Sequence, residues 1–318
     1  MDFDNLDRRA HPQGLTIDRW HAPDGWDHRR WRWPAEPTKS ARGSMIFQAG
    51  RGDFFEKYLE SLAQWHADGW NLCGFDWRGQ SGSGRFLANP KVGHVEGFEA
   101  WTADLQAFAE PWLAEMPGPH VLAGHSMGGH LIMRYLIEQQ PPIDAVVLSA
   151  PMLKVVSKPF SEKLAAFIAR FLAGIGLAKV KAWPGNERPS VPGSSRQKLL
   201  THDFDRYADE DWWTANHPEL KLGPPSWRWL VSAYASSAAM FAEGVLEKID
   251  VPVLMVATAQ DRLVSADAIR EAAERLPDVR LYMHEIAAHE LLRERDDIRD
   301  EVMREIVDFL EARAPARR

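Results

Sequence analysis

A serine between two glycines is the residue whose surroundings most clearly suggest chemistry. The stretch Gly124-His125-Ser126-Met127-Gly128 matches the pattern G-x-S-x-G, with strand-forming residues before it and a helical pattern after it. In this pattern a strand turns sharply into a helix, and the glycines let neighbouring backbone pack close to the bend. The hydroxyl then stands at the positive end of the helix dipole. We therefore predict that Ser126 is a nucleophile; the alternative is a turn that only requires its glycines.

A serine hydroxyl is a weak nucleophile until a base removes its proton. After a G-x-S-x-G bend, the acid and then the histidine base follow the serine along the chain. Beyond the helical pattern that directly follows Ser126, the histidines are His202, His217, His284 and His289. The first two lie where the strand–helix rhythm stops, and His284 lies within a strand pattern. His289 follows that strand in the loop AAHELL and is the predicted base; the alternative is a solvated loop histidine.

The acid that orients this base should also follow a strand at the same edge of the sheet. Asp261 directly follows the apolar run VLMVATAQ and meets this condition. Asp250 precedes that strand, Asp267 falls inside the next helical pattern, and Glu290 is too close in sequence to His289 to support it. We therefore predict Asp261 as the acid of a catalytic triad; the alternative is a helix-capping aspartate.

The negative oxygen that forms during acyl transfer requires two backbone N–H donors. One is predicted to be Met127, the residue after the nucleophile. The other should come from the loop QAGRGDFFEKY, where Gly50 and Gly52 allow the chain to bend toward Ser126. Arg51 is the predicted donor, with Gly50 as the near alternative. The alternative is that this loop is an ordinary strand-to-helix turn with no catalytic role.

The elements around these residues alternate between apolar strands and amphipathic helices. A hairpin pattern around Pro-Asp-Gly (residues 15–35) comes first, and strand and helix patterns then alternate up to residue 150 and again from residue 245. Continuous apolar strands joined by helices predict an α/β fold with a mostly parallel sheet flanked by helices. We expect residues 1–150 and 245–318 to form this core domain.

Between the two halves the rhythm stops. Residues 151–244 predict a helical cap, or lid, inserted after the sixth strand, with a Pro/Gly/Ser loop at residues 183–196. One helix should carry an apolar face. The first interpretation of this face is packing onto the core; the second is an acyl-chain channel or contact with lipid aggregates. Its residues are Phe160, Leu164, Phe167, Ile168, Phe171, Leu172 and Ile175, with Lys158, Lys163 and Arg170 beside them.

Composition and motifs narrow the function classes further. The chain has 318 residues and a formal net charge of −7, which argues against an electrostatic nucleic-acid binder. Its basic stretch HRRWRWP is expected to be an exposed hairpin strand.

The turn DWRGQSGSGR lacks a phosphate-binding pattern, so Asp76 and Arg78 are expected to hold the loop structurally. No metal-ligand spacing is present, and we predict no metal or cofactor. Without a signal-peptide or membrane-spanning pattern, we expect a cytoplasmic protein, with peripheral membrane contact left open.

Several segments together resemble the α/β-hydrolase superfamily, and within it the monoglyceride lipase and bacterial lysophospholipase branch. Monoglyceride lipases usually carry His-Gly before the oxyanion residue, and Ala49-Gly50 of this chain is closer to the bacterial lysophospholipases. The segments are AGRGDFFEKY (residues 49–58), GFDWRGQSGSGR (74–85), GHSMGG (124–129), AQDRLV (259–264), AAHELLRERDDIRDEV (287–302) and, less specifically, LGPPSWRWL (222–230).

The resemblance implies an ester hydrolase that works through an acyl-serine intermediate without a metal or cofactor. The implied substrate is a monoacyl lipid, either a lysophospholipid or a monoacylglycerol. Two alternatives stay open: a carboxylesterase for small soluble esters, and a non-catalytic homologue that kept the pocket for ligand binding. The sequence does not determine the oligomeric state.

Overall fold

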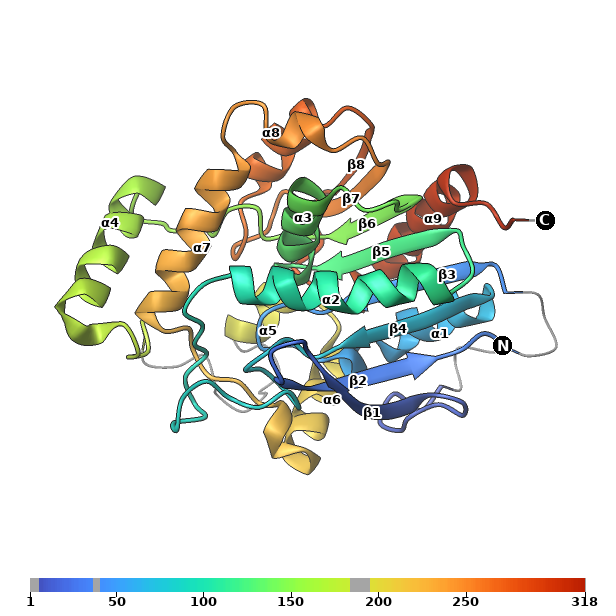
Figure 1. Ribbon diagram of the computed structural model, residues 1–318, viewed down its shortest axis with the longest axis horizontal. Helices are drawn as coiled ribbons and strands as arrows, with labels where there is room; N and C mark the ends of the chain where they lie inside the picture. Colours follow the sequence, from blue (N-terminus) through green and yellow to red (C-terminus); the bar gives the residue numbers. More distant parts are fainter. Residues whose placement is uncertain (1–5, 37–40, 184–194, 318) are drawn as a thin grey trace.

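An eight-stranded sheet forms the centre of the molecule. The computed structural model describes residues 6–36, 41–183 and 195–317, and the strand order is β1-β2-β4-β3-β5-β6-β7-β8 (Figure 1). β1 and β2 form an antiparallel hairpin that joins β4 antiparallel, and the other strand pairs are parallel. The strands are β1 (Thr16–His21), β2 (Asp27–Trp33), β3 (Gly43–Gln48), β4 (Trp70–Phe75), β5 (His120–His125), β6 (Ala145–Ser149), β7 (Val253–Thr258) and β8 (Val279–His284).

Helices cover both faces of this sheet. In Figure 1, α2 and α3 lie in front of the strands, and α1 and α9 lie behind them. All residues of β3, β6 and β7 are buried, which explains their continuous apolar runs. The predicted α/β architecture, a mostly parallel sheet flanked by helices, is thereby confirmed. The covering elements are α1 (Leu59–Ala67), preceded by the 3-10 turn η2 (Phe55–Tyr58), α2 (Glu99–Glu115), α3 (Met127–Gln139), α8 (Ala266–Arg275) and α9 (Asp296–Arg313), preceded by η6 (Leu291–Arg293).

Helical segments fill the stretch between β6 and β7. Residues 184–194, which make up most of the predicted Pro/Gly/Ser loop, lie outside the described residues. Residues 1–5, at the start of the segment in which no signal-peptide pattern is present, also lie outside them. The segments are α4 (Glu162–Leu172), the π-helical η3 (Ala173–Leu177), α5 (Ser195–Leu200), α6 (Phe204–Asn216), η4 (Pro218–Leu220), α7 (Trp227–Met240) and η5 (Leu246–Lys248).

The strand order brings two distant loops together. β3 and β5 are neighbours in the sheet, and Gln48 pairs with Gly124 at their ends. The chain leaves β3 toward β4 on one side and returns to β5 on the other, so the loops that follow β3 and β5 meet outside the carboxyl ends of these strands. This is the place where open α/β sheets bind their ligands.

Two expectations about surfaces were wrong. The apolar face of α4 does not pack onto the core, because Ala166 and Ala169 are its buried residues while Phe167 and Phe171 are exposed. The stretch HRRWRWP forms β2, but this strand lies inside the sheet between β1 and β4, and Trp31 is buried there. In both cases the periodicity of apolar residues predicted the helix or strand correctly. What each element faces depends on its neighbours in the fold, which the periodicity does not show.

Gly128 in the first turn of α3 tests how tightly this helix is held against β3. A β-carbon at this position would lie 2.3 Å from the Gln48 carbonyl oxygen and 2.6 Å from that of Ala49. We expect Gly128→Ala to lower the free energy of unfolding by about 1–3 kcal/mol, measured by urea denaturation. Gly174→Ala is the matched control, because no atom lies within 4 Å of its added carbon. Equal unfolding midpoints for both variants would contradict the packing described here.

Candidate active site

Ser126 occupies the junction between β5 and α3. Its backbone angles, φ 50° and ψ −115°, lie in a region that residues with a side chain rarely adopt. The bend is held from both sides, because the Ser126 N–H donates to the Ser149 carbonyl (2.9 Å) and the Ser126 carbonyl accepts from the Met152 N–H (2.9 Å). The hydroxyl does not cap α3, and the residue is half-buried. The serine therefore presents its side chain at the carboxyl edge of the sheet.

Asp261 and His289 meet at the same edge. Asp261 follows β7, His289 follows β8, and His289 Nδ1 lies 2.6 Å from Asp261 Oδ2. The other oxygen of Asp261 accepts hydrogen bonds from the N–H groups of Leu263 (2.8 Å) and Val264 (3.0 Å). Burial would raise the pKa of Asp261, but the contacts with His289 and with these N–H groups hold it below its ordinary value. The carboxylate is thus ionised and fixed in orientation.

The imidazole of His289 is buried close to the chain segment that carries Ser126. Its ring centre lies 4.8 Å from that of His125, the residue that precedes Ser126. Burial would lower the pKa of His289, but the charge and hydrogen bond of Asp261 raise it above its ordinary value. Within the described residues no hydrogen bond joins His289 to the Ser126 hydroxyl, so this contact stays a prediction. Such contacts are often long before a substrate binds.

The rival candidates have other partners. His202 bonds to Glu294 through Nδ1 (2.8 Å), and His284 Nε2 lies 3.6 Å from Glu301. Among the acids, Asp267 is exposed and contacts Arg270. None of these three contacts involves Asp261 or His289.

The loop after β3 lies against the nucleophile. A β-carbon on Gly50 would sit 3.2 Å from Cβ of Ser126, so only glycine fits there without a shift. The Gly50 N–H points to Asp53 Oδ2 at 3.3 Å, which favours Arg51 over Gly50 as an oxyanion donor. Met127 is the first residue of α3, and the first N–H groups of a helix have no carbonyl partner within it. Arg51 and Met127 stay the predicted donors.

Sequence reasoning missed a buried ionic cluster behind these residues. Lys57 Nζ lies 2.7 Å from Asp53, 2.7 Å from Glu290 and 3.0 Å from Glu210. Burial would lower the pKa of Lys57, but the three carboxylates raise it above its ordinary value. Glu290 also contacts Arg293. The spacing of Asp53 and Lys57, four residues apart, was a signal for one of these pairs.

The cluster connects to the nucleophile through Tyr58. The Tyr58 hydroxyl donates to Asp53 Oδ2 (2.5 Å) and lies 2.8 Å from His125 Nδ1. Burial, with the nearby charge of Asp53, raises the pKa of Tyr58 well above its ordinary value. Charged groups from three distant parts of the chain therefore meet in this cluster, and Tyr58 links them to the residue that precedes Ser126.

The inserted helices also hold the loop that carries His289. The N–H of His289 donates to the Leu199 carbonyl (3.2 Å), and the N–H of Glu290 donates to that of Leu200 (2.7 Å). From the core side, the Thr258 hydroxyl donates to the Ala287 carbonyl (2.8 Å). The imidazole is thereby positioned by both parts of the chain.

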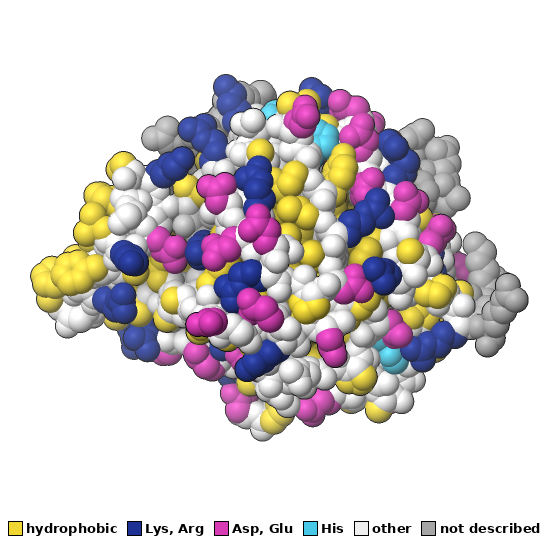
Figure 2. Space-filling view, turned by 90° about the horizontal axis from the view of Figure 1, so that it is seen from above, with side chains coloured by type: hydrophobic (Ala, Val, Ile, Leu, Met, Phe, Trp, Pro, Cys, Tyr) yellow, Lys and Arg dark blue, Asp and Glu magenta, His cyan; other side chains and the backbone are white. Residues whose placement is uncertain are grey.

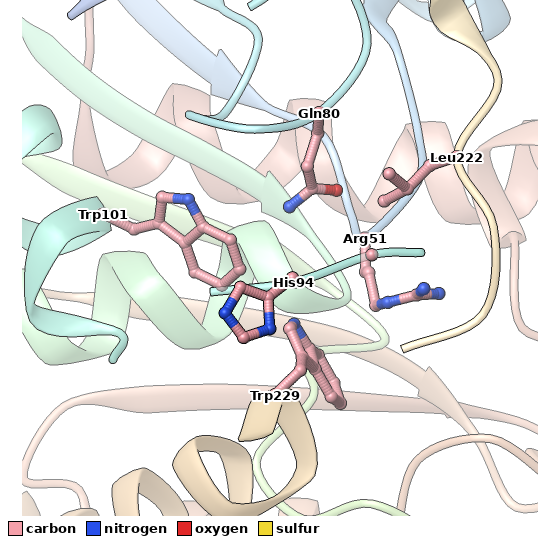
Figure 3. Close-up of a pocket in the computed structure, with 7 residues that line it drawn as sticks. Arg51, Gln80, His94, Trp101, Leu222 and Trp229 are labelled. Carbon is pink, nitrogen blue, oxygen red and sulfur yellow. The ribbon is translucent and has the colours of Figure 1, made fainter. Parts of the chain in front are cut away.

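A small pocket lies next to the predicted oxyanion loop (Figure 3). Its side chains fill it so closely that no water-sized space remains. The Arg51 guanidinium stacks 5.5 Å from the Trp229 ring of α7 and bonds to the Gly223 carbonyl. Trp229 is largely buried and also lines the pocket. The other lining residues are Gln80, Gly93, His94, Trp101 and Leu222.

The glycine-rich turn after β4 is structural, as expected. Arg78 forms hydrogen bonds to Asp104 (2.9 Å to Oδ2) and to Asp24 (3.0 Å to Oδ1), while Asp76 contacts Arg29 (3.1 Å). These contacts hold the turn against the hairpin and α2.

Replacement of the acid should change the pH dependence of turnover. The kcat/KM for a short ester should fall as the pH drops through the raised pKa of His289, because a protonated imidazole accepts no proton. Asp261→Asn removes the charge that raises this pKa, so the acid limb should move to lower pH. The value of kcat should fall roughly 10⁴-fold. A pH–rate profile with an unmoved acid limb would argue against the assignment.

Lys57→Met should destabilise the fold strongly. It leaves three buried carboxylates without their shared cation, and loss of one partner from a buried ion pair costs about 3–5 kcal/mol. Urea unfolding measures this loss. Lys248→Met, at an exposed position, is the control with an expected change near zero; equal effects of the two variants would exclude a stabilising role for the cluster.

Comparison with known proteins agrees with this architecture. The chain is 29% identical over 284 residues to lysophospholipase L2 of Escherichia coli, which covers 83% of this chain and 79% of that protein. A soluble variant of monoglyceride lipase from Saccharomyces cerevisiae, solved with a substrate analogue, superposes with a TM-score of 0.78 at 18% identity, covering 98% of each chain. A carboxyl esterase from Bacillus coagulans, solved with glycerol, gives 0.74 at 18% identity, covering 95% of this chain and 99% of the other.

The two structural likenesses establish the fold. The family model Hydrolase_4, described as serine aminopeptidase, S33, matches residues 39–296, which run from the start of β3 into α9 and include the loops of Ser126, Asp261 and His289. This chain therefore belongs to the Hydrolase_4 (serine aminopeptidase, S33) family, with an α/β-hydrolase fold.

Proposed function

We propose that this protein is a serine hydrolase of carboxylic esters, and that its substrates are monoacyl lipids such as lysophospholipids or monoacylglycerols. The observation that carries the proposal is the 2.6 Å hydrogen bond between His289 and Asp261, at the same sheet edge as the strained Ser126. A buried, ionised acid that orients a histidine beside an accessible serine is the arrangement that activates a hydroxyl nucleophile.

The reaction proceeds in two halves. His289 takes the hydroxyl proton as Ser126 attacks the ester carbonyl, and Asp261 stabilises the imidazolium that forms. The N–H groups of Met127 and Arg51 donate to the oxyanion. The alcohol then leaves with the proton from His289, which gives an acyl-serine. Water loses a proton to His289 as it attacks the acyl carbon, and Ser126 recovers that proton as the free acid departs.

Residues 151–244 act, in this proposal, as a cap over the site. Support comes from their contacts with the catalytic loops: Leu199 and Leu200 bond to the loop of His289, and Gly223 bonds to the Arg51 side chain. Because this insertion both holds the base, through α5, and lines the pocket, through Leu222 and α7, substrate shape and catalytic geometry are coupled. We assign residues 1–150 and 245–318 to the catalytic core.

Two kinds of evidence support a lipid substrate. The relative from Escherichia coli is named a lysophospholipase, and the neighbour from Saccharomyces cerevisiae is a monoglyceride lipase. The exposed apolar side chains of the cap would also suit a lipid. No helix in the described ranges has both the length and the apolar character needed to span a bilayer.

A fold neighbour supports one alternative. The structurally similar protein from Bacillus coagulans is a carboxyl esterase. A carboxylesterase for small esters is therefore the second candidate. A non-catalytic ligand binder is the third, and differs from both in having no reactive serine.

Labelling with a fluorophosphonate probe tests the chemistry. Wild-type protein should react at Ser126, because His289 removes the hydroxyl proton, and Ser126→Ala should not react. Mass spectrometry of the modified peptide identifies the site, and Ser149→Ala is the control for a nearby buried serine. An unlabelled wild-type protein that retains its fold would favour the ligand-binding alternative.

A substrate panel then separates the two enzymatic candidates. Lysophospholipids, monoacylglycerols and short-chain esters are compared by kcat/KM under identical conditions. We expect long monoacyl substrates to be preferred by at least about tenfold, since each buried methylene contributes about 0.8 kcal/mol to binding. A sharp preference for short chains would assign the protein to the small-ester carboxylesterases.

A further inference from the structure

A histidine one turn beyond the nucleophile is buried where α3 meets the inserted helix α7. His130 is fully buried, and both of its ring nitrogens have partners. Nδ1 lies 2.9 Å from the Met152 carbonyl oxygen, and Nε2 lies 2.6 Å from the Ser236 hydroxyl on α7. The Arg134 guanidinium donates to the same hydroxyl (2.6 Å). The chemistry of the triad does not account for these contacts.

The chemistry of the partners fixes the direction of each hydrogen bond. A carbonyl oxygen has no proton to donate, so Nδ1 of His130 carries the proton and donates to Met152. Burial and the charge of Arg134 lower the pKa of His130 to about 3, although the Met152 carbonyl raises it, so the ring is neutral and Nε2 is an acceptor. The Ser236 hydroxyl therefore donates to Nε2 and accepts from Arg134, which can only donate.

This series of hydrogen bonds ends at the nucleophile. The Met152 N–H donates to the Ser126 carbonyl (2.9 Å), and the His130 N–H donates to that carbonyl as well (3.1 Å). His130 thus holds the turn twice, directly through its backbone and through Met152 by its ring. An unbroken series of hydrogen bonds therefore runs from α7 to the backbone of the nucleophile.

The segment that follows β6 also holds the loop of the acid. The N–H of Val156 donates to the Leu263 carbonyl (3.0 Å), two residues beyond Asp261. Helix α7 contacts the same segment a second time, because the Tyr234 hydroxyl lies 2.9 Å from that of Ser157. The position of α7 is therefore linked through one segment to the turn of the nucleophile and to the loop of the acid.

Packing alone does not require a polar pair between two helices. Burying a hydroxyl or an imidazole costs free energy unless each polar atom finds a partner, and an apolar pair would pack without that requirement. The polar pair adds direction, because a hydrogen bond favours one distance and one angle. The contact between His130 and Ser236 is thus suited to fix where α7 lies relative to the nucleophile.

Helix α7 stands between the core and one end of the molecule. In Figure 1 it lies between α3 and α4, and Trp229 near its start lines the pocket beside Arg51. On its far side α7 packs against α4, at the extremity where Figure 2 shows hydrophobic side chains on the surface. Contacts on the core side, among them the bond to His130, therefore determine where this wall of the pocket lies.

We propose that His130 and Ser236 are positioning residues, which transmit the position of α7 to the backbone that holds Ser126 and thereby set the reactivity of the nucleophile. These roles rest on the proposed ester hydrolysis, because they are defined by a reaction at Ser126. In this arrangement α7, whose Trp229 lines the pocket, couples what the pocket contains to the alignment of the serine.

The rate of phosphonylation at Ser126 tests these roles. The full chain is treated with a small alkyl fluorophosphonate, and the maximal rate constant (kinact) is determined separately from the concentration that gives half the maximal rate (KI). The variants are His130→Asn, whose amide N–H can replace Nδ1–H without reaching α7, Ser236→Ala, and the double variant. Ser232→Ala is the matched control, because Ser232 is buried on the same helix and its hydroxyl donates to the Glu96 carbonyl instead (3.2 Å).

We expect kinact to fall at least about fivefold in each single variant, because a lost bond lets the turn leave its reactive geometry. KI should change little, since neither side chain lines the pocket beside Arg51. The double variant should react no more slowly than the slower single variant, because both changes break the same bond. Ser232→Ala should react like wild type. A purely structural role would lower the urea midpoint and leave kinact unchanged.

Two further measurements test the bond pattern without any reaction. Nuclear magnetic resonance of the histidine nitrogens should show a proton on Nδ1 of His130 and a neutral ring down to about pH 5. The signal is assigned by its loss in His130→Asn. Ser236→Ala should also speed amide hydrogen exchange in residues 150–157, whereas Ser232→Ala should not.

The outcomes separate the positioning roles from the proposed function. A wild-type protein that reacts at Ser126, with both single variants keeping its kinact, would overturn the positioning roles alone. A proton on Nε2 of His130, or hydrogen exchange that Ser236→Ala leaves unchanged, would also overturn them. A folded wild-type protein that does not react would instead overturn the proposed function, and the positioning roles with it.

Discussion

The sharp turn between β5 and α3 is the constraint on which the rest of the structure depends. Ser126 adopts φ 50° there, a conformation that costs on the order of 1–3 kcal/mol, and it persists because backbone bonds from Ser149 and Met152 fix both sides. Close packing of Gly50 against the serine completes the support. The strained turn keeps the hydroxyl at the carboxyl edge of the sheet, where the loops that follow β3, β7 and β8 also begin.

The charged cluster around Lys57 gives this edge its rigidity. It joins the loop after β3, through Asp53, to the inserted helices, through Glu210, and to the loop of His289, through Glu290. A buried ion cluster adds little stability relative to an apolar core. Any arrangement that separates its members is strongly destabilised, because it leaves a buried charge without its partner. The loop after β3, the inserted helices and the loop of His289 therefore hold one relative geometry, which the proposed reaction requires.

Sequence reasoning predicted the parts of the molecule that depend on local patterns. Buried parallel strands produce apolar runs, so the sheet and the loop positions of Ser126, Asp261 and His289 could be predicted. The partners of Lys57 could not, because Glu290 lies 233 residues away along the chain. The direction in which the apolar side of α4 points could not be predicted either. An amphipathic pattern shows that one side of a helix is apolar, but it does not show what that side contacts.

The account stands on the convergence of one nucleophile, one base and two backbone donors at this edge. The most direct measurement is a crystal structure of the covalent adduct with a long-chain alkyl phosphonate, which mimics the tetrahedral intermediate. The account predicts phosphorus on Ser126 Oγ, the phosphonyl oxygen within hydrogen-bond distance of the Met127 and Arg51 N–H groups, and His289 Nε2 facing Oγ. An adduct on another residue, or a phosphonyl oxygen turned away from both N–H groups, would contradict it.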